Sequence, residues 1–192
     1  MLYKFLSGLA KGVTHCIFRV KVVGKENVPK DGGMILAVNH KSNWDPIFAG
    51  AYCPRPLRFM AKADLFKNKL FGGLIKKLGA FPIQRGRGDI GAIKGAFSIL
   101  KNNDAMLIFP EGHRIKNGKR VKAKLGVSMI AVYAKVPVIP LCISGEYKPF
   151  HKVTVTFGEP ITFEEYYGKK PDNETLQTLA DEVMQTIYSF DN

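Results

Sequence analysis

The chain has 192 residues, of which 46% are hydrophobic and 23% are charged, values typical of one folded domain with a buried core. No run approaches the ~18 consecutive apolar residues that a bilayer-spanning helix needs, which argues against an integral membrane protein. The net charge of +13 favours anionic partners, namely nucleic acid, lipid headgroups or phosphorylated small molecules, while a charged surface that only aids solubility is the alternative.

The first 18 residues predict an amphipathic helix. Its apolar residues recur at helical spacing and are Leu2, Phe5, Leu6, Leu9, Val13, Cys16 and Ile17. Lys4 and Lys11 interrupt the apolar run, and no small-residue cleavage site follows, so the pattern does not favour a signal peptide. Because the basic residues Arg19 and Lys21 come next, we interpret residues 1–18 as a membrane-interface helix. The alternative is a helix that docks on the core of its own domain.

Residues 19–192 predict a single domain in which strands and helices alternate. Strands are expected at 18–23, 34–38, 57–61, 80–83, 105–109, 136–143 and 153–157. Helices are expected at 45–52, 64–78 (broken), 89–100, 126–134 and 173–190. This alternation favours an α/β sandwich in which helices flank a largely parallel central sheet.

The basic charge lies in the body of the chain. Residues 159–192 hold two basic and eight acidic residues, whereas residues 1–158 hold 27 basic and eight acidic ones. The sequence has no helix-turn-helix pattern and no aromatic-rich nucleic-acid motif, so we expect an anionic membrane surface and no nucleic acid as partner. Three cysteines without metal-ligand spacing, Cys16, Cys53 and Cys142, favour buried free thiols.

His40 lies five residues before Asp45, just after the apolar run 34–38. A chain that leaves a buried strand can place both side chains in one cleft. A carboxylate that binds one imidazole nitrogen fixes the tautomer and makes the other nitrogen a better base. The pair is therefore a candidate for taking a proton from an alcohol, although a surface histidine is the commoner explanation of this spacing alone. Two ligands without a third do not predict a metal site.

Three further stretches stand at predicted strand ends, where open α/β sheets bind their ligands. Arg85 lies among glycines, a pattern that suits phosphate binding by a guanidinium group, although a basic turn is the alternative. Glu111, Gly112 and Arg114 precede a basic loop and combine a carboxylate with cations that could hold phosphate. Residues 136–141 form an apolar strand with two prolines, which predicts buried core or the wall of an apolar groove.

These stretches, in this order, resemble the glycerophospholipid acyltransferase family, and most closely its bacterial 1-acyl-glycerol-3-phosphate acyltransferases. The family blocks Asn-His-x-x-x-x-Asp, Gly-x-x-x-(Ile/Val)-x-Arg, Phe-Pro-Glu-Gly-Thr-Arg-Ser and Val-Pro-Val-Ile-Pro correspond to residues 39–45, 79–85, 109–115 and 136–140. His113 and Ile115 stand where the family has threonine and serine, and this difference bears on the fine substrate preference. The resemblance covers roughly residues 24–157.

The resemblance implies a direct acyl transfer. His40 would act as general base on the sn-2 hydroxyl of lysophosphatidate, and Asp45 would orient His40. Acyl-coenzyme A or acyl-carrier protein would supply the acyl chain, and phosphatidate would form without a metal, a cofactor or an acyl-enzyme. The substrate-binding residues that the resemblance implies are Arg85, Glu111, Gly112, Arg114 and Lys124.

With these partners we expect peripheral, monotopic attachment to the cytoplasmic face of the cell membrane. Two alternatives stay open at this point. One is an acyltransferase with another acceptor, such as glycerol 3-phosphate or a lyso-aminolipid. The other is a non-catalytic basic module that binds membrane or nucleic acid.

Overall fold

The computed structural model describes residues 2–83, 90–115 and 120–191, and residue 89, where the helix predicted at 89–100 would begin, lies outside them. Seven strands form one sheet in the order β1-β7-β6-β2-β5-β3-β4. The strands are β1 (Arg19–Val23), β2 (Met34–Val38), β3 (Leu57–Lys62), β4 (Ala80–Ile83), β5 (Ala105–Ile108), β6 (Val138–Gly145) and β7 (Lys152–Phe157). Only the β6–β7 pair is antiparallel. The predicted α/β fold with a largely parallel sheet is confirmed.

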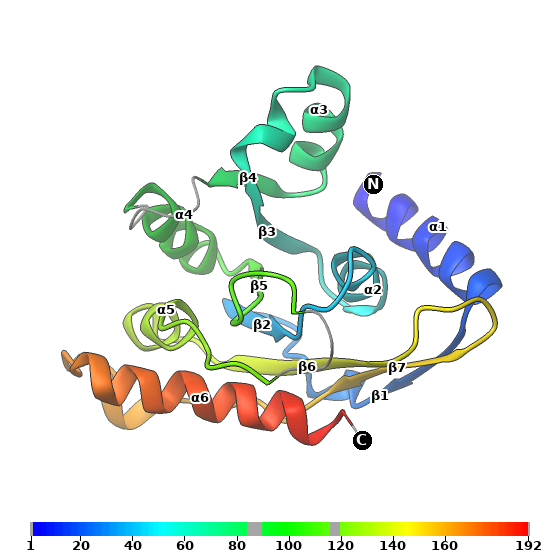
Figure 1. The fold of residues 1–192 in the computed structure, drawn as a ribbon. Helices are drawn as coiled ribbons and strands as arrows, with labels where there is room; N and C mark the ends of the chain where they lie inside the picture. Colours follow the sequence, from blue (N-terminus) through cyan, green and yellow to red (C-terminus); the bar gives the residue numbers. More distant parts are fainter. Residues whose placement is uncertain (1, 84–89, 116–119, 192) are drawn as a thin grey trace.

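Helices cover both faces of the sheet (Figure 1). One face packs against α1 (Leu2–Ile17) and α2 (Asp45–Tyr52). The other packs against α4 (Ile90–Lys101), α5 (Gly126–Ala134) and α6 (Asn173–Ser189). The helix α3 (Lys69–Lys77) joins β3 to β4, and the 3₁₀ turns are η1 (Lys25–Asn27), η2 (Ala63–Phe66) and η3 (Glu164–Tyr166).

Strand β2 shows why this sequence needs cover on both faces. All five of its residues are apolar and buried. Met34, Leu36 and Val38 belong to the cluster under α2, whereas Ile35 and Ala37 belong to the cluster under α5 and α6. A strand with side chains alternating between two dry layers reads as a continuous apolar run, which is typical of a central parallel strand.

Pro140 lies inside β6, opposite Ala37 of β2. The sequence placed this strand at residues 136–143, but the strand begins at Val138, after Pro137, and continues to Gly145. Pro140 is tolerated because pairing with β7 begins only at Leu141, and the Pro140 carbonyl still accepts a 2.8 Å hydrogen bond from Gly158.

The three cysteines are free thiols, and Cys53 and Cys142 are buried. The prediction of burial was wrong for Cys16, which lies on an exposed face of α1. Its apolar neighbours in sequence belong to two different helix faces, so the apolar stretch around Cys16 did not define which face is buried.

One face of α1 docks on α2. The Ser7 hydroxyl donates to the carbonyls of Gly50 and Ala51, each at 3.2 Å. Deeper in the interface the buried Thr14 hydroxyl lies 2.7 Å from the Tyr52 hydroxyl. The opposite face of α1 leaves four apolar side chains exposed, namely Leu2, Phe5, Leu9 and Val13. The helix is therefore docked on its own domain on one side and apolar on the other, and its contact with a membrane stays a prediction. Within the described residues no helix is long and apolar enough to cross a bilayer.

Candidate active site

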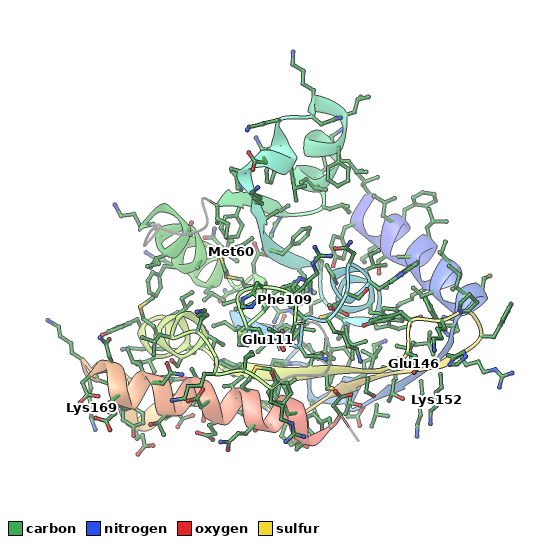
Figure 2. All side chains as sticks on the ribbon, viewed as in Figure 1. Met60, Phe109, Glu111, Glu146, Lys152 and Lys169 are labelled. Atoms are coloured by element: carbon green, nitrogen blue, oxygen red, sulfur yellow. The ribbon has the colours of Figure 1, made fainter. Side chains whose placement is uncertain are left out.

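Two loops leave neighbouring strands at the same edge of the sheet. Strands β2 and β5 are parallel partners, so the residues that follow them emerge side by side. The first loop carries His40 and leads into α2, and the second carries Phe109 and Glu111, which Figure 2 shows near the centre of the molecule. A 2.7 Å hydrogen bond from the Ile115 N–H to the His40 carbonyl ties the two loops together.

The structure places His40 against Asp45, as their spacing predicts. The Nδ1 atom of His40 lies 2.9 Å from Oδ2 of Asp45, which is fully buried in the first turn of α2. The same oxygen accepts the backbone N–H groups of Lys41 and Ser42, both at 2.7 Å. An ionised carboxylate only accepts hydrogen bonds, so Nδ1 of neutral His40 carries the proton and Nε2 holds a lone pair.

The imidazole of His40 is fixed from a second direction. Its ring stacks on Phe109, with centroids 3.9 Å apart and planes inclined by 20°. Across residues 2–83, 90–115 and 120–191, Nε2 has no hydrogen-bond partner. Part of the side chain reaches solvent. The ring is therefore held in one orientation, with Nε2 left without a partner among the described residues.

Asn39 anchors to β6 the start of the loop that carries His40. Its side-chain amide donates to the Ile143 carbonyl at 3.1 Å, and its carbonyl accepts the Ile143 N–H at 2.8 Å. Both atoms are buried, and this pair of bonds replaces a stretch of strand pairing just where β2 ends. The asparagine of the motif thus supports the loop that presents His40.

Tyr147 is part of the site that the sequence did not reveal. Its hydroxyl donates a hydrogen bond to Oδ1 of Asp45, the oxygen that His40 does not use. Burial, together with the nearby charge of Asp45, raises the pKa of Tyr147, so the hydroxyl stays protonated. Tyr147 lies two residues beyond the end of β6, at the carboxyl end of a strand next to β2, and this placement is the signal that could have found it.

Replacing Tyr147 with phenylalanine is expected to lower kcat by about tenfold and the free energy of unfolding by about 1–3 kcal/mol. The reason is that a buried carboxylate oxygen loses its donor. Steady-state rates and denaturant unfolding measure the two effects. Tyr133→Phe, on the exposed surface of α5, is the matched control and should change neither. A variant at Tyr147 with a wild-type kcat would contradict a role in orienting Asp45.

Glu111 is buried, and both of its carboxylate oxygens are engaged. Oε2 accepts the backbone N–H of His40 at 2.6 Å, and Oε1 accepts the Tyr188 hydroxyl of α6 at 3.3 Å. Burial raises the pKa of Glu111 to about 7, because desolvation outweighs the two hydrogen bonds. Glu111 therefore holds the backbone of His40 in place. Its predicted role in substrate binding stays a prediction.

Because burial raises the pKa of Glu111 from 4.5 to about 7, the folded protein binds this proton more tightly than the unfolded chain does. The resulting stability is fully present below about pH 4.5 and is lost as the pH rises to about 7. Glu111→Gln cannot titrate, so we expect its stability relative to wild type to improve by up to about 3 kcal/mol between about pH 5 and about pH 8. Denaturant midpoints at both pH values measure this difference, and parallel pH profiles would contradict it.

The remaining predicted residues lie around the same loops. Nη1 of Arg114 donates to the Asn43 side-chain carbonyl at 3.0 Å. Gly112 has a φ of 75°, and a Cβ there would come within 3.2 Å of Lys124 Cγ, so the glycine permits both the turn and the close approach of the lysine. Arg114 and Lys124 are exposed cations, and the Lys124 N–H donates to the Pro110 carbonyl in the loop of Glu111 at 2.7 Å. Arg85 lies outside the described residues.

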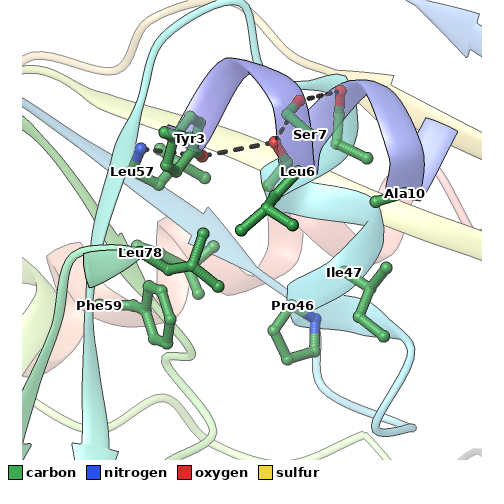
Figure 3. A pocket seen from close by; sticks show the side chains of 12 residues that line it. Tyr3, Leu6, Ser7, Ala10, Pro46, Ile47, Leu57, Phe59 and Leu78 are labelled. Atoms are coloured by element: carbon green, nitrogen blue, oxygen red, sulfur yellow. Dashed lines mark hydrogen bonds between the residues drawn. The ribbon is translucent and has the colours of Figure 1, made fainter. Parts of the chain in front are cut away.

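An apolar pocket lies beside Asp45, between α1, α2 and β3 (Figure 3). Pro46 and Ile47, which directly follow Asp45, line it together with Leu6 of α1 and Phe59 of β3. It encloses about 560 Å³, part of which is open to solvent. Apolar walls of this kind suit a hydrocarbon chain.

Within the described part of the chain no three His, Cys, Asp or Glu side chains are placed to hold a metal ion.

The fold and the site together combine an α/β sheet, a histidine held by a buried carboxylate and an apolar pocket. The model of the Acyltransferase family matches residues 19–144, so the chain belongs to this family and is an acyltransferase. The resemblance that the four sequence blocks indicated is confirmed.

Its relatives carry more specific names. A 1-acyl-sn-glycerol-3-phosphate acyltransferase of Bacillus subtilis (strain 168) is 32% identical, and the alignment covers 100% of this chain and 98% of the relative. A protein of the same name from Streptococcus pneumoniae is 33% identical, with 100% and 74% coverage. The crystal structure of the 1-acyl-sn-glycerophosphate acyltransferase of Thermotoga maritima superposes with a TM-score of 0.78 at 28% identity, covering 97% of this chain and 78% of that one.

Proposed function

We propose that this acyltransferase transfers an acyl chain to the sn-2 hydroxyl of 1-acyl-glycerol 3-phosphate (lysophosphatidate) and so forms phosphatidate for phospholipid synthesis. The observation that carries the proposal is the 2.9 Å contact between Nδ1 of His40 and Oδ2 of Asp45, which leaves Nε2 free as a base. The names of the full-length relatives support this acceptor.

In the proposed mechanism Nε2 of His40 takes the proton of the acceptor hydroxyl as its oxygen attacks the thioester carbonyl. Asp45 stabilises the imidazolium that forms, because its carboxylate accepts the Nδ1–H. The tetrahedral intermediate then collapses to an ester. The thiolate leaves and receives the proton back from His40, so the base is regenerated without any net change in the enzyme.

Transfer without an acyl-enzyme is supported by the state of the buried thiols. Burial raises the pKa of Cys53 to about 11 and that of Cys142 to about 12, so neither supplies a thiolate near neutral pH. Either acyl-coenzyme A or acyl-carrier protein would provide the activated acyl group as a thioester. Because the thioester is already activated, we propose that the reaction uses no resident cofactor or metal.

The acceptor carries a phosphate and an acyl chain, and the site offers a surface for each. Arg114 and Lys124 supply exposed positive charge around the loop of Glu111, and Arg85 is the third cation that we propose for phosphate binding. Gly112 would let the phosphate approach the backbone. The apolar pocket beside Pro46 would receive an acyl chain.

We propose peripheral attachment to the cytoplasmic face of the membrane, where both acyl donors are found. The outer face of α1 exposes apolar side chains, including Phe5 at 69% and Leu9 at 56% of their surface. A helix that docks one face on its domain and turns an apolar face outward is suited to lie in the lipid interface. Residues 1–158, with 27 basic and eight acidic residues, would favour an anionic leaflet.

The double substitution Phe5→Ser and Leu9→Ser is expected to move most of the protein from the membrane fraction to the soluble fraction. Both side chains point away from the interface with α2, so the fold should survive, and circular dichroism checks this. Lys4→Gln, on the exposed surface of the same helix, is the control: it removes one charge and leaves the apolar surface intact. Unchanged membrane binding of the double variant would contradict attachment through α1.

A comparison of acceptors tests the proposed specificity. The purified protein is assayed with lysophosphatidate, glycerol 3-phosphate and a lyso-aminolipid, each with acyl-coenzyme A and with acyl-carrier protein. We expect kcat/KM to be highest for lysophosphatidate with at least one donor. A preference for glycerol 3-phosphate or for the lyso-aminolipid would leave the acyltransferase chemistry in place but contradict the proposed acceptor.

A further inference from the structure

Residues 62–77, which carry η2 and α3, turn large apolar side chains toward solvent. Leu70 is 89% exposed, Phe71 is 47% exposed and Leu74 is 43% exposed, and Leu65 is exposed as well. Figure 1 shows α3 projecting from the edge of the sheet near β4. So much apolar surface on one short segment marks an interaction site.

The outward direction of these side chains is fixed by the opposite face of α3. Ile75 is buried against Ala61 and Ala80. Gly72 is buried too, and a Cβ there would lie 2.8 Å from the Phe66 Cα, so η2 and α3 pack backbone to backbone. The Asn68 side chain accepts the Phe71 N–H at 3.0 Å and caps the helix. The apolar residues are therefore presented by a packed and capped helix.

Positive charge surrounds the apolar surface. The lysines of the segment are Lys62, Lys67, Lys69, Lys76 and Lys77, and its one acidic residue is Asp64. Lys62 and Lys67 hold the Asp64 carboxylate at 2.5 and 2.7 Å. Hydrogen bonds from these two lysines lower the pKa of Asp64 to about 2. A net charge of +4 from five lysines and one aspartate opposes contact with a second copy of this segment and favours an anionic surface.

The segment lies near the N-terminal end of α1. Leu78, which directly follows α3, lines the apolar pocket together with Tyr3 and Leu6 of α1. Figure 1 places α3 and the N-terminal end of α1 at the same edge of the molecule, and Figure 3 shows Leu78 in the pocket with Tyr3 and Leu6. Two outward apolar elements therefore flank the pocket that lies beside Asp45.

We propose that residues 62–77 form a second lipid-contacting element. Leu70, Phe71 and Leu74 enter the interfacial region of an anionic bilayer, and the surrounding lysines contact the lipid phosphates. This inference rests on the proposed peripheral attachment and extends it. A protein attached through α1 alone would be free to tilt on the membrane. With contacts on both sides, the pocket faces the leaflet from which a lipid acceptor enters.

A dye at position 70 tests the contact directly. Cys16→Ser removes the exposed thiol, Leu70→Cys introduces a new one, and the two remaining thiols are buried with pKa values raised to about 11 and about 12. An environment-sensitive dye there should shift to the blue and rise about twofold in emission with phosphatidylglycerol-containing vesicles. A dye at Tyr133→Cys on α5 is the control and should not respond. A vesicle-bound protein whose position-70 dye stays unchanged would overturn the proposal.

A second variant separates this contact from the activity. Leu70→Ser with Phe71→Ser should weaken binding to the same vesicles by about tenfold or more, whereas Tyr133→Ser should not. Acylation of a short-chain lysophosphatidate below its micellar concentration should stay at the wild-type rate, because neither residue lines the pocket. A loss of that rate, or a position-70 dye that responds to acidic acyl-carrier protein and not to vesicles, would overturn the lipid contact. If the wild type itself acylates no lysophosphatidate, the proposed acceptor is contradicted. The vesicle measurements test the lipid contact independently of that result.

Discussion

Replacing His40 with alanine is expected to lower the rate of acyl transfer by about 10²–10⁴-fold, the range that a well-placed general base contributes. In the variant the acceptor hydroxyl has no group to receive its proton as it attacks, because Nε2 is the free nitrogen at the site. KM for the acceptor should change far less than kcat, since the cations that we propose for phosphate binding are untouched. Initial rates of phosphatidate formation measure the effect.

The folding of the His40 variant needs its own check, because the imidazole also stacks on Phe109. Thermal unfolding and circular dichroism should show a folded protein with modestly reduced stability. His151→Ala is the matched control, because His151 is exposed and forms only a surface pair with Glu146 at 3.5 Å. A folded His40 variant that keeps wild-type kcat would contradict the assignment of the base.

Asp45→Asn is expected to lower kcat by about 10²–10³-fold. An amide oxygen can still accept the hydrogen bonds from His40, Lys41 and Ser42, so the geometry of the loop should largely persist. What disappears is the negative charge that stabilises the imidazolium, an interaction of about 4 kcal/mol at 4 Å in a medium of effective dielectric constant about 20. The kcat of the folded variant measures this electrostatic contribution.

Asp104→Asn is the control for Asp45→Asn. Asp104 pairs with Arg58 at 3.1 Å on the surface, where an ion pair contributes little. Its kcat and stability should match those of the wild type. Equal losses in the two variants would indicate a general effect of removing a carboxylate, in conflict with a specific role for Asp45.

Much of the fold could be predicted because the sequence patterns are strong. The buried run of β2 and the helical spacing in α6 identify elements whose bounds the structure shifts by one or two residues at most. The strand order could not be derived, because β1 pairs with β7 from the other end of the chain. Nothing local in residues 19–23 specifies a partner that is more than 100 residues away.

In the site, too, local contacts could be predicted and contacts between remote segments could not. His40 and Asp45 share one loop and helix start, so their contact follows from their spacing. Tyr147 and Tyr188 come from remote segments, 102 and 77 residues from the carboxylates that they bind. Glu111 was predicted to bind substrate, and only the folded chain shows that its oxygens hold the His40 N–H and the Tyr188 hydroxyl. Contacts of this kind depend on packing between elements, which residue spacing does not encode.

The outward face of α3 is another feature that the sequence did not predict. Its sequence, Lys-Leu-Phe-Gly-Gly-Leu-Ile-Lys-Lys, places its four large apolar residues on one face of the helix. Ile75 and Gly72 turn inward because Phe66 packs against the glycine, and this contact sends Leu70 outward. An amphipathic pattern predicts that the apolar face packs on the core, and it does not show that only the edge of this face at Ile75 is buried.

The most direct test of the central claim is the identity of the product. Purified wild-type protein is incubated with 1-acyl-glycerol 3-phosphate and labelled acyl thioester, and the lipids are then treated with a phospholipase that cleaves only the sn-2 ester. We expect labelled phosphatidate whose label is released from the sn-2 position. Labelled free fatty acid without phosphatidate, or label that stays on the glycerol backbone after this cleavage, would contradict the proposed function.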